Sequence, residues 1–150
     1  MYEQKLNELG ITIPETVKPL AAYIPAMQVG NLVMTSGQVP ISEGKVVYQG
    51  KVGKDLSEEE GTRAAKLCAL NCLSAIRSVI GSLDKIIRVV KLTVFVSSAD
   101  GFTAQPNVAN GASEFIGEIF GEAGKHIRSA VGVSELPLNS AVEIEMVVEL

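Results

Sequence analysis

The chain has no tryptophan, one histidine and two cysteines in 150 residues, and only three tyrosines and four phenylalanines. Zinc hydrolases and most histidine-based catalytic triads need more imidazole or thiol groups, so the composition argues against both classes. So few aromatic side chains also argue against a surface on which nucleic-acid bases stack. The sequence therefore predicts no metal site and no cofactor.

Long apolar runs and clusters of basic residues are absent as well. No run approaches the roughly 18 apolar residues that a membrane span needs, and the polar start "MYEQKLNELG" lacks a basic-then-apolar signal pattern. The net charge is −4 and lysine and arginine do not cluster, which argues against binding to phosphate backbones. We therefore expect a cytoplasmic protein with no membrane and no nucleic-acid partner.

The length and the hydrophobic fraction of 47% suit one ordinary globular domain over residues 1–150. Cys68 and Cys72 lie four residues apart within an apolar helical pattern. This spacing favours two small core residues over a disulfide framework.

The first half of the chain predicts two strands and a helix. A polar, proline-containing lead at 13–19 precedes a strand expected at 31–39, and the short strand in "GKVVYQG" is expected to be its hairpin partner. A helix is predicted from Ser57, which forms a capping box with Glu60, to a natural stop at Gly81.

The second half predicts three strands and another helix. The β-branched run 85–98 indicates a long central strand, and a helix is expected at about 108–120. The last stretch, "HIRSAVGVSELPLNSAVEIEMVVEL", reads as two strands joined by a short loop. The predicted order is β-β-α-β-α-β-β, an α+β two-layer fold with a mostly antiparallel sheet and two helices on one face.

Alternation along the final strand places its charged residues away from the helices. Glu143, Glu145 and Glu149 alternate with an apolar set that should meet the helices: Val142, Ile144, Met146, Val148 and Leu150. If the last two strands pair as a hairpin, Arg128 can share the uncovered face with Glu143.

That uncovered face has two interpretations. Antiparallel sheets permit a solvated face, so the charges could be ordinary surface charges. However, Val33 or Met34, Val89 and Phe95 are expected on the same face, and self-association is the simplest cover for it. Charges in a self-associated surface are costly unless they are used or paired. The pattern alone leaves both interpretations open.

Two segments resemble a known family. "VGNLVMTSGQVP" resembles the N-terminal signature of the Rid family (reactive intermediate deaminases, also called YjgF-like or endoribonuclease L-PSP-like proteins), and "RSAVGVSELPLNSAVEIE" resembles its C-terminal signature. The resemblance covers residues 17–150. It implies a chorismate-mutase-like fold and a homotrimer with clefts between subunits. It also implies cofactor-independent hydrolysis of 2-imino acids such as 2-iminopropanoate or 2-iminobutanoate to 2-keto acids and ammonia.

The resemblance assigns roles to five residues of this chain. Arg128 corresponds to the arginine that binds the substrate carboxylate, and Glu143 to the glutamate near the attacking water. Tyr23 corresponds to a wall of the cleft. Ser36 and Gly37 correspond to residues that line the pocket with hydroxyl and backbone groups.

The chain also departs from the family pattern, as a divergent subgroup would. Ala130 stands where many members have a cysteine, although its backbone N–H can still hold substrate. The cleft asparagine corresponds to Asn110 with a one-residue gap, or to Ser113 in another alignment. His126 could be catalytic or could make only local hydrogen bonds.

Several functions remain open at this level. A regulatory trimer that captures small keto acids would need the same arginine as an imine deaminase. An endoribonuclease or translation inhibitor is a further alternative, against which the acidic charge and few aromatics weigh. A chorismate-mutase-like isomerase would need several cationic side chains around a dicarboxylate.

Overall fold

The computed structural model of the chain describes residues 1–16 and 21–150, so the end of the predicted lead at 13–19 lies outside the described residues. Short 3-10 turns η1 (Leu83–Lys85), η2 (Gly121–Gly124) and η3 (Pro137–Asn139) separate some of the main elements. The main elements are α1 (Tyr2–Glu8), β1 (Ala26–Val29), β2 (Leu32–Thr35), β3 (Ile41–Ser42), β4 (Lys45–Val46), α2 (Glu58–Ile80), β5 (Arg88–Ser97), α3 (Gln105–Phe120), β6 (Ile127–Val133) and β7 (Val142–Glu149).

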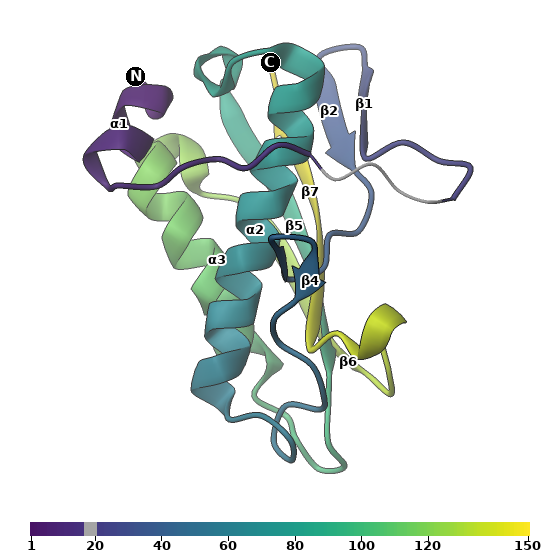
Figure 1. The fold of residues 1–150 in the computed structure, drawn as a ribbon. Helices are drawn as coiled ribbons and strands as arrows, with labels where there is room; N and C mark the ends of the chain where they lie inside the picture. Colours follow the sequence, from purple (N-terminus) through teal and green to yellow (C-terminus); the bar gives the residue numbers. More distant parts are fainter. Residues whose placement is uncertain (17–20) are drawn as a thin grey trace.

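Five strands form one sheet in the order β1-β2-β7-β5-β6, and β3 and β4 form a separate two-stranded sheet. Helices α2 and α3 lie side by side against one face of the large sheet (Figure 1). β7 is antiparallel to both of its neighbours, whereas β6 runs parallel to β5. The predicted α+β two-layer class is confirmed, with α1, β1 and β3 as additional elements.

Helix α2 follows the sequence prediction closely. The Ser57 hydroxyl accepts a hydrogen bond from the Glu60 N–H at 3.1 Å, and the Glu60 carboxylate accepts one from the Ser57 N–H at 2.7 Å. This reciprocal capping box satisfies two backbone donors that the helix start would otherwise leave without partners. Gly81 ends the helix at φ 85°, a left-handed conformation that glycine adopts readily.

Helix α3 packs closely on α2 because Gly111 has no side chain. A Cβ at Gly111 would lie 2.1 Å from the Thr62 carbonyl oxygen, so any other residue would force the two helices apart. α3 begins three residues earlier than predicted, at Gln105, with Pro106 in its first turn, where a missing N–H costs no intrahelical hydrogen bond.

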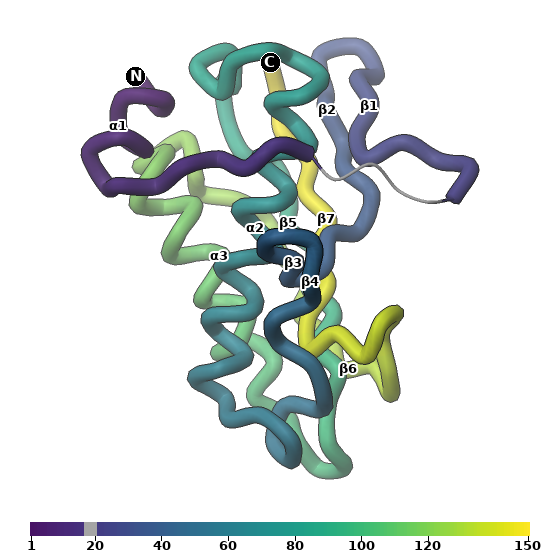
Figure 2. The backbone as a smooth tube through the Cα atoms, viewed as in Figure 1, coloured from purple at the N-terminus to yellow at the C-terminus, as the bar shows by residue number. Residues whose placement is uncertain are grey.

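The segment after α1 and the β3–β4 hairpin are fastened to the outer side of α2. The backbone trace in Figure 2 shows this first segment crossing α2. Arg77 donates a hydrogen bond to the Ile13 carbonyl at 3.0 Å, and Ser74 donates one to the Pro14 carbonyl at 2.6 Å. On the hairpin side, Asn71 donates hydrogen bonds to the backbone carbonyls of Val39 and Ile41, each at 3.0 Å.

The predicted pairing of the early strands is wrong. β2 pairs with β1 through a tight turn at Gly30, where φ is 61°. The "GKVVYQG" segment contains β4, which pairs only with β3 through a turn with positive φ at Glu43 and Gly44. Two adjacent positive-φ residues match the right-handed twist of a short hairpin, so a local turn decided this pairing.

The predicted hairpin of the last two strands is also wrong. β7 lies between β2 and β5, whereas β6 pairs with β5 on the other side. Because α3 connects β5 to β6, these elements form a β-α-β unit, in which a helical crossover joins parallel neighbours. The short loop from β6 to β7 therefore joins strands that are not adjacent.

The sheet face away from the helices is partly apolar, as predicted. Met34 and Phe95 lie on it, but Val89 is fully buried in the core because a bulge between Val89 and Lys91 shifts the alternation of β5. The register of the sheet brings five exposed apolar side chains to this face: Met27, Val29, Met34, Ile127 and Val131. Such a face, next to the unpaired edge of β6, is typical of a protein that self-associates.

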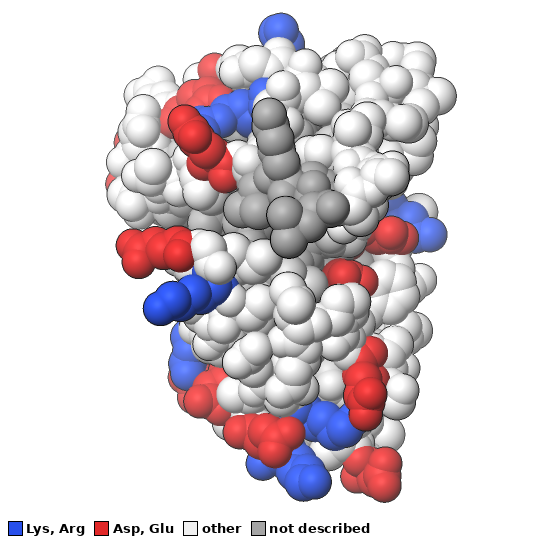
Figure 3. Space-filling model, turned by 45° about the vertical axis from the view of Figure 1, so that its right-hand side comes forward, with Lys and Arg blue, Asp and Glu red and all other residues white. Residues whose placement is uncertain are grey.

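Charged side chains are dispersed over the surface. On the face shown in Figure 3, basic and acidic groups are interspersed and no large continuous basic area is present among the described residues. No helix of residues 1–16 and 21–150 combines the length and apolar character that crossing a membrane requires.

The two cysteines are buried core residues, as predicted. Burial raises the pKa of the Cys68 thiol and raises the pKa of the Cys72 thiol to about 12. Their sulfurs lie 3.5 and 3.3 Å from the carbonyl oxygens of Val142 and Ile144, so both thiols pack against β7.

We predict that neither thiol reacts with iodoacetamide in the native protein at pH 8. The thiolate is the reactive form, and burial both disfavours it and blocks access to the reagent. Mass spectrometry should show both cysteines alkylated only after denaturation in guanidinium chloride. Rapid labelling of either cysteine under native conditions would contradict their placement in the core.

Candidate functional site

The Arg128 guanidinium lies against α3 and is held entirely by neutral acceptors. Its Nη1 donates to Asn110 Oδ1 at 2.8 Å and to Ser113 Oγ at 3.1 Å, and its Nη2 lies 3.4 Å from the Pro106 carbonyl oxygen. Both Asn110 and Ser113, the two alternatives for the family asparagine, therefore contact the arginine. They lie three residues apart on α3 and so share one helix face.

Arg128 is half-buried and differs from the other arginines of the chain. Arg63, Arg77 and Arg88 each lie within 4.0 Å of a glutamate oxygen, whereas Arg128 has no carboxylate partner among the described residues. A guanidinium carries five N–H donors, and the three contacts above leave two of them for a ligand. A half-buried cation of this kind can bind a carboxylate through two parallel hydrogen bonds.

The predicted face of Arg128 is wrong. In the parallel pairing of β5 with β6, Arg128 lies beside Leu92 and Ala130 lies beside Val94, and both partners are fully buried under the helices. Arg128 and Ala130 therefore point to the helix side, not to the uncovered face. The hairpin assumed from the sequence gave the opposite orientation.

His126 extends the hydrogen-bond network around Arg128. Its Nδ1 lies 2.6 Å from the Gly124 carbonyl oxygen, which can only accept, so Nδ1 carries a proton. Its Nε2 lies 2.9 Å from Ser113 Oγ. In the neutral ring Nε2 accepts the Ser113 hydroxyl proton, which directs an Oγ lone pair toward Arg128. His126 therefore helps to fix the acceptor that holds the guanidinium.

Glu143 lies on the uncovered face of β7, as predicted, beside Gly37. A Cβ at Gly37 would lie 2.8 Å from the Glu143 carboxyl carbon, so glycine leaves room for this side chain. The neighbouring Gln38 exchanges two backbone hydrogen bonds with Ile144, at 2.7 and 3.0 Å. These bonds fix the segment after β2 against the start of β7.

The Glu143 carboxyl has a raised pKa. Partial burial of the carboxyl is the main cause, and the negative charge of Glu145, two residues along the same strand face, adds to it. Both effects disfavour the carboxylate form, so the group is better able to carry a proton near neutral pH than an ordinary glutamate.

Ser36, which precedes Gly37, is hydrogen-bonded to the segment that contains Tyr23. The Ser36 hydroxyl donates to the Ile24 carbonyl at 2.6 Å, and its backbone N–H donates to the Pro25 carbonyl at 2.7 Å. Ser36 therefore holds the segment that carries Tyr23, whose side chain is 56% exposed. This role for the hydroxyl was not part of the sequence prediction.

The candidate residues form two separate groups in one chain. Glu143 pairs with Phe95, which pairs with Val131, and Arg128 lies three residues before Val131. Strand spacing and rise per residue then separate the Cα atoms of Glu143 and Arg128 by roughly 14 Å, with their side chains on opposite faces. One small acid cannot contact both groups within a single chain.

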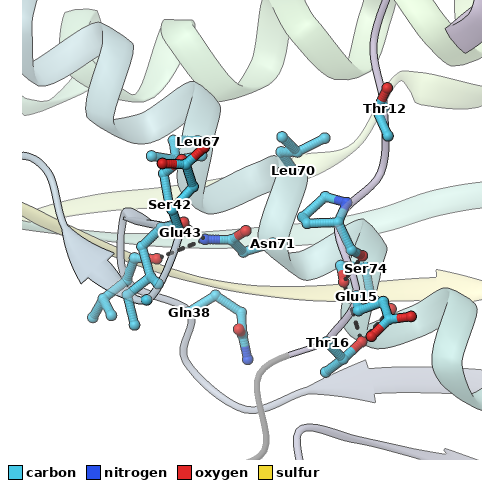
Figure 4. A pocket seen from close by; sticks show the side chains of 14 residues that line it. Thr12, Glu15, Thr16, Gln38, Ser42, Glu43, Leu67, Leu70, Asn71 and Ser74 are labelled. Carbon is cyan, nitrogen blue, oxygen red and sulfur yellow. Dashed lines mark hydrogen bonds between the residues drawn. The ribbon is translucent and has the colours of Figure 1, made fainter.

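A different cleft, of about 390 Å³, lies between the segment after α1, the β3–β4 hairpin and α2 (Figure 4). Its charged lining residues are the acidic Glu15 and Glu43, which would repel a carboxylate ligand. The hydrogen bonds from Asn71 and Ser74 across it connect chain segments to α2, so its polar groups serve packing.

The described residues, 1–16 and 21–150, contain no group of three histidine, cysteine, aspartate or glutamate side chains that could hold a metal ion.

Comparison with known proteins identifies the family of the chain. The family model described as "YjgF/chorismate_mutase-like, putative endoribonuclease" matches residues 3–150. The chain belongs to this Rid, or YjgF-like, family. A relative from Trypanosoma cruzi, Protein TCP17, is 43% identical over 146 residues, which cover 97% of this chain and 91% of the relative.

Two further matches bear on structure and chemistry. A crystal structure of the protein Atu1372, of unknown function, from Agrobacterium tumefaciens matches with a TM-score of 0.92 and 44% identity, covering 99% of this chain and 92% of that one. A 2-iminobutanoate/2-iminopropanoate deaminase from Dermatophagoides farinae is 32% identical over 138 residues, covering 92% of this chain and 93% of the relative.

The sequence of this Rid-family chain did not lead us to predict that Asn110 and Ser113 would both accept hydrogen bonds from Arg128. The signal was the spacing of Asn110 and Ser113, which fits one helix face once α3 is extended to Gln105. It also left His126 open, because a contact across 13 residues depends on how η2 turns the chain toward α3.

We predict that Glu145→Gln lowers the pKa of Glu143, which should still stay above that of an ordinary glutamate because burial remains. Carbon-detected NMR titration of the Glu143 carboxyl measures this change. A raised folded-state pKa gives stability that is present at acid pH and is lost as pH rises through that pKa. Removing the Glu145 charge should therefore raise the melting temperature at pH 7 more than at pH 4.

Glu149→Gln provides the matched control, because Glu149 lies at the far end of β7 and pairs with Arg88 at 2.9 Å. This variant should leave the Glu143 titration unchanged. An unchanged Glu143 pKa in Glu145→Gln would show that the two carboxyls do not interact.

Proposed function

We propose that the protein hydrolyses 2-imino acids, and their enamine forms, to 2-keto acids and ammonia without a cofactor. The observation that carries this proposal is Arg128, a half-buried guanidinium with two N–H donors left for a ligand and no carboxylate partner among the described residues. A 2-imino acid supplies the missing carboxylate next to its reactive carbon. Membership of a family with an imine deaminase supports the choice of reaction.

The proposed reaction needs positioning and proton transfer. Arg128 holds the substrate carboxylate, and a water oxygen attacks the imine carbon. The attacking water gives up one proton while the C=N electron pair moves to nitrogen, which takes a proton, and a carbinolamine results. Its amino group then takes a further proton and leaves as ammonia, while the hydroxyl loses its proton to form the ketone. A fixed orientation of the substrate lowers the barrier, since the bound acid no longer has to find the productive geometry.

Glu143 is the proposed proton carrier. A carboxyl with a pKa closer to neutrality can take the proton from water and return it to the departing nitrogen. Gly37 leaves room for this carboxyl, and the backbone hydrogen bonds of Gln38 hold the adjacent segment in place beside it. Tyr23 is the proposed wall of the cleft, and the Ala130 backbone is proposed to help hold the substrate.

The active site is proposed to form between subunits of a homotrimer. Arg128 and Glu143 lie on opposite faces of one chain, so Arg128 of one subunit must meet Glu143 of another. The partly apolar uncovered face and the unpaired edge of β6 provide surfaces for this association. The proposal therefore requires the oligomer for activity.

The direct assay measures ammonia released from 2-iminopropanoate generated in place by an amino-acid-consuming enzyme. We predict that Arg128→Gln and Glu143→Gln each reduce the rate at least about a hundredfold, because each removes a group that acts on the reacting atoms. The uncatalysed decay of the imine is subtracted as background.

Mixing the two variants tests where the site forms. Subunits carrying Arg128→Gln and Glu143→Gln, co-expressed in equal amounts, should recover about a quarter of wild-type activity, since random assembly gives that share of clefts with both native residues. A mixture as inactive as its components would show that each site forms within one chain. Light scattering on the purified mixture checks that its mass equals that of the wild-type trimer.

A regulatory protein that binds keto acids without chemistry is the main alternative. Arg128-dependent binding of pyruvate without ammonia release would favour it, and pyruvate binding and imine hydrolysis that both survive Arg128→Gln would exclude the arginine from both roles. An endoribonuclease is named in the description of the family model. RNA cleavage that Arg128→Gln and Glu143→Gln reduce as strongly as they reduce imine hydrolysis would support that function instead.

A further inference from the structure

A cavity of about 440 Å³ lies beside Arg128 and extends along the C-terminal half of α3 toward η2. This volume is within the usual range for small-ligand pockets, roughly 300–1,000 Å³, and much larger than a three-carbon acid needs. Its lining consists of Ser113, Gly117, Gly121, Gly124, Lys125, His126 and Arg128. Arg128, which is proposed to bind the substrate carboxylate, thus also forms part of the wall of this cavity.

The lining of this cavity carries cationic groups and no carboxylate. Lys125 and Arg128 contribute positive charge, and His126 adds an imidazole. Lys125 pairs with Glu122 at 2.9 Å, but the two side chains are 76% and 87% exposed. An exposed pair of this kind is weak, so the lysine can exchange it for a ligand anion at little cost.

Gly117 keeps the cavity open at a cost to helix stability. It lies inside α3, where glycine is a poorer helix former than alanine. A Cβ at Gly117 would meet nothing within 4 Å, whereas one at Gly111 would strike the α2 backbone. Packing within the chain therefore explains Gly111 and does not explain Gly117. Space for a ligand does explain it, since any side chain there would project into the cavity.

We propose that this cavity is a subsite for a second carboxylate, so that the preferred substrate is a 2-imino acid whose side chain ends in an acidic group. The 1-carboxylate would bind Arg128, and the terminal carboxylate would lie near Lys125 and the His126 ring. This inference rests on the proposed function, because it assumes that Arg128 holds the first carboxylate.

Neutral hydroxyl and imidazole groups suit the middle of this subsite. Ser113 and His126 are linked to each other and to Arg128, so the wall between the two anion positions is preorganised. A substrate with a methyl side chain would leave the cationic end of the cavity without a partner. A dicarboxylate would neutralise it, and charge-assisted hydrogen bonds are the stronger kind.

The first test compares two stable keto acids by calorimetry, pyruvate with one carboxylate and 2-oxoglutarate with two. We expect 2-oxoglutarate to bind at least about tenfold more tightly, because an additional charge-assisted contact is available. Lys125→Gln should remove most of this advantage and leave pyruvate affinity unchanged. Lys45→Gln, at an exposed lysine of the β3–β4 hairpin, is the matched control and should change neither affinity.

Substitution of Gly117 separates the subsite from stability. Gly117→Ala should raise the melting temperature, because alanine is the better helix former and meets no neighbour. Gly117→Leu should fill the cavity and reduce the affinity for 2-oxoglutarate at least about tenfold while pyruvate still binds. A higher melting temperature in Gly117→Ala, together with a loss of 2-oxoglutarate affinity in Gly117→Leu, would show that the space at Gly117 serves ligand binding and not folding.

The possible failures are distinguishable. Equal affinity for both acids, each lost in Arg128→Gln, would overturn the subsite and leave the imine deaminase proposal standing. Absence of Arg128-dependent binding for either acid would overturn both. If Gly117→Leu instead broke the oligomer, as light scattering would show, the cavity would belong to a subunit contact and the subsite would be wrong.

Discussion

The structure around the candidate site depends on how the Arg128 charge is held. Asn110, Ser113 and the Pro106 carbonyl supply neutral acceptors, which orient the guanidinium but leave its charge uncompensated. A glutamate in place of Ser113 or Asn110 would satisfy the cation within the chain and weaken the proposed binding of an external carboxylate. The restriction to neutral acceptors is therefore what makes this arginine suitable for an external carboxylate.

That environment exists because β5, α3 and β6 form a crossover unit. The helix returns over the sheet, β6 joins β5 in parallel, and the register then points Arg128 toward the helix. Gly111 lets α3 approach α2, which fixes the helix position and with it Asn110 and Ser113. Packing between the two helices thus helps to set the distance between the arginine and its acceptors.

The same topology separates Arg128 from Glu143. Insertion of β7 between β2 and β5 keeps Glu143 on the uncovered face, near Gly37, while Arg128 lies at the sheet edge on the opposite face. Neither group can complete a site for a small acid alone. In the proposed oligomer, this partly apolar sheet face, which carries a carboxyl with a raised pKa, is the surface on which a second subunit would supply the missing cation.

The sequence alone determined the local and periodic features of this protein. The capping box at Ser57, the apolar set of β7 and the buried cysteines follow from short-range spacing, and the two Rid-like motifs identified the family. Only the tertiary structure decided the strand pairing, the side of the sheet on which Arg128 lies, and the contact of His126 with Ser113. Pairing depends on which strand is adjacent in space, and a change of partner can reverse the face that a residue occupies. Short-range patterns carry no information about that choice.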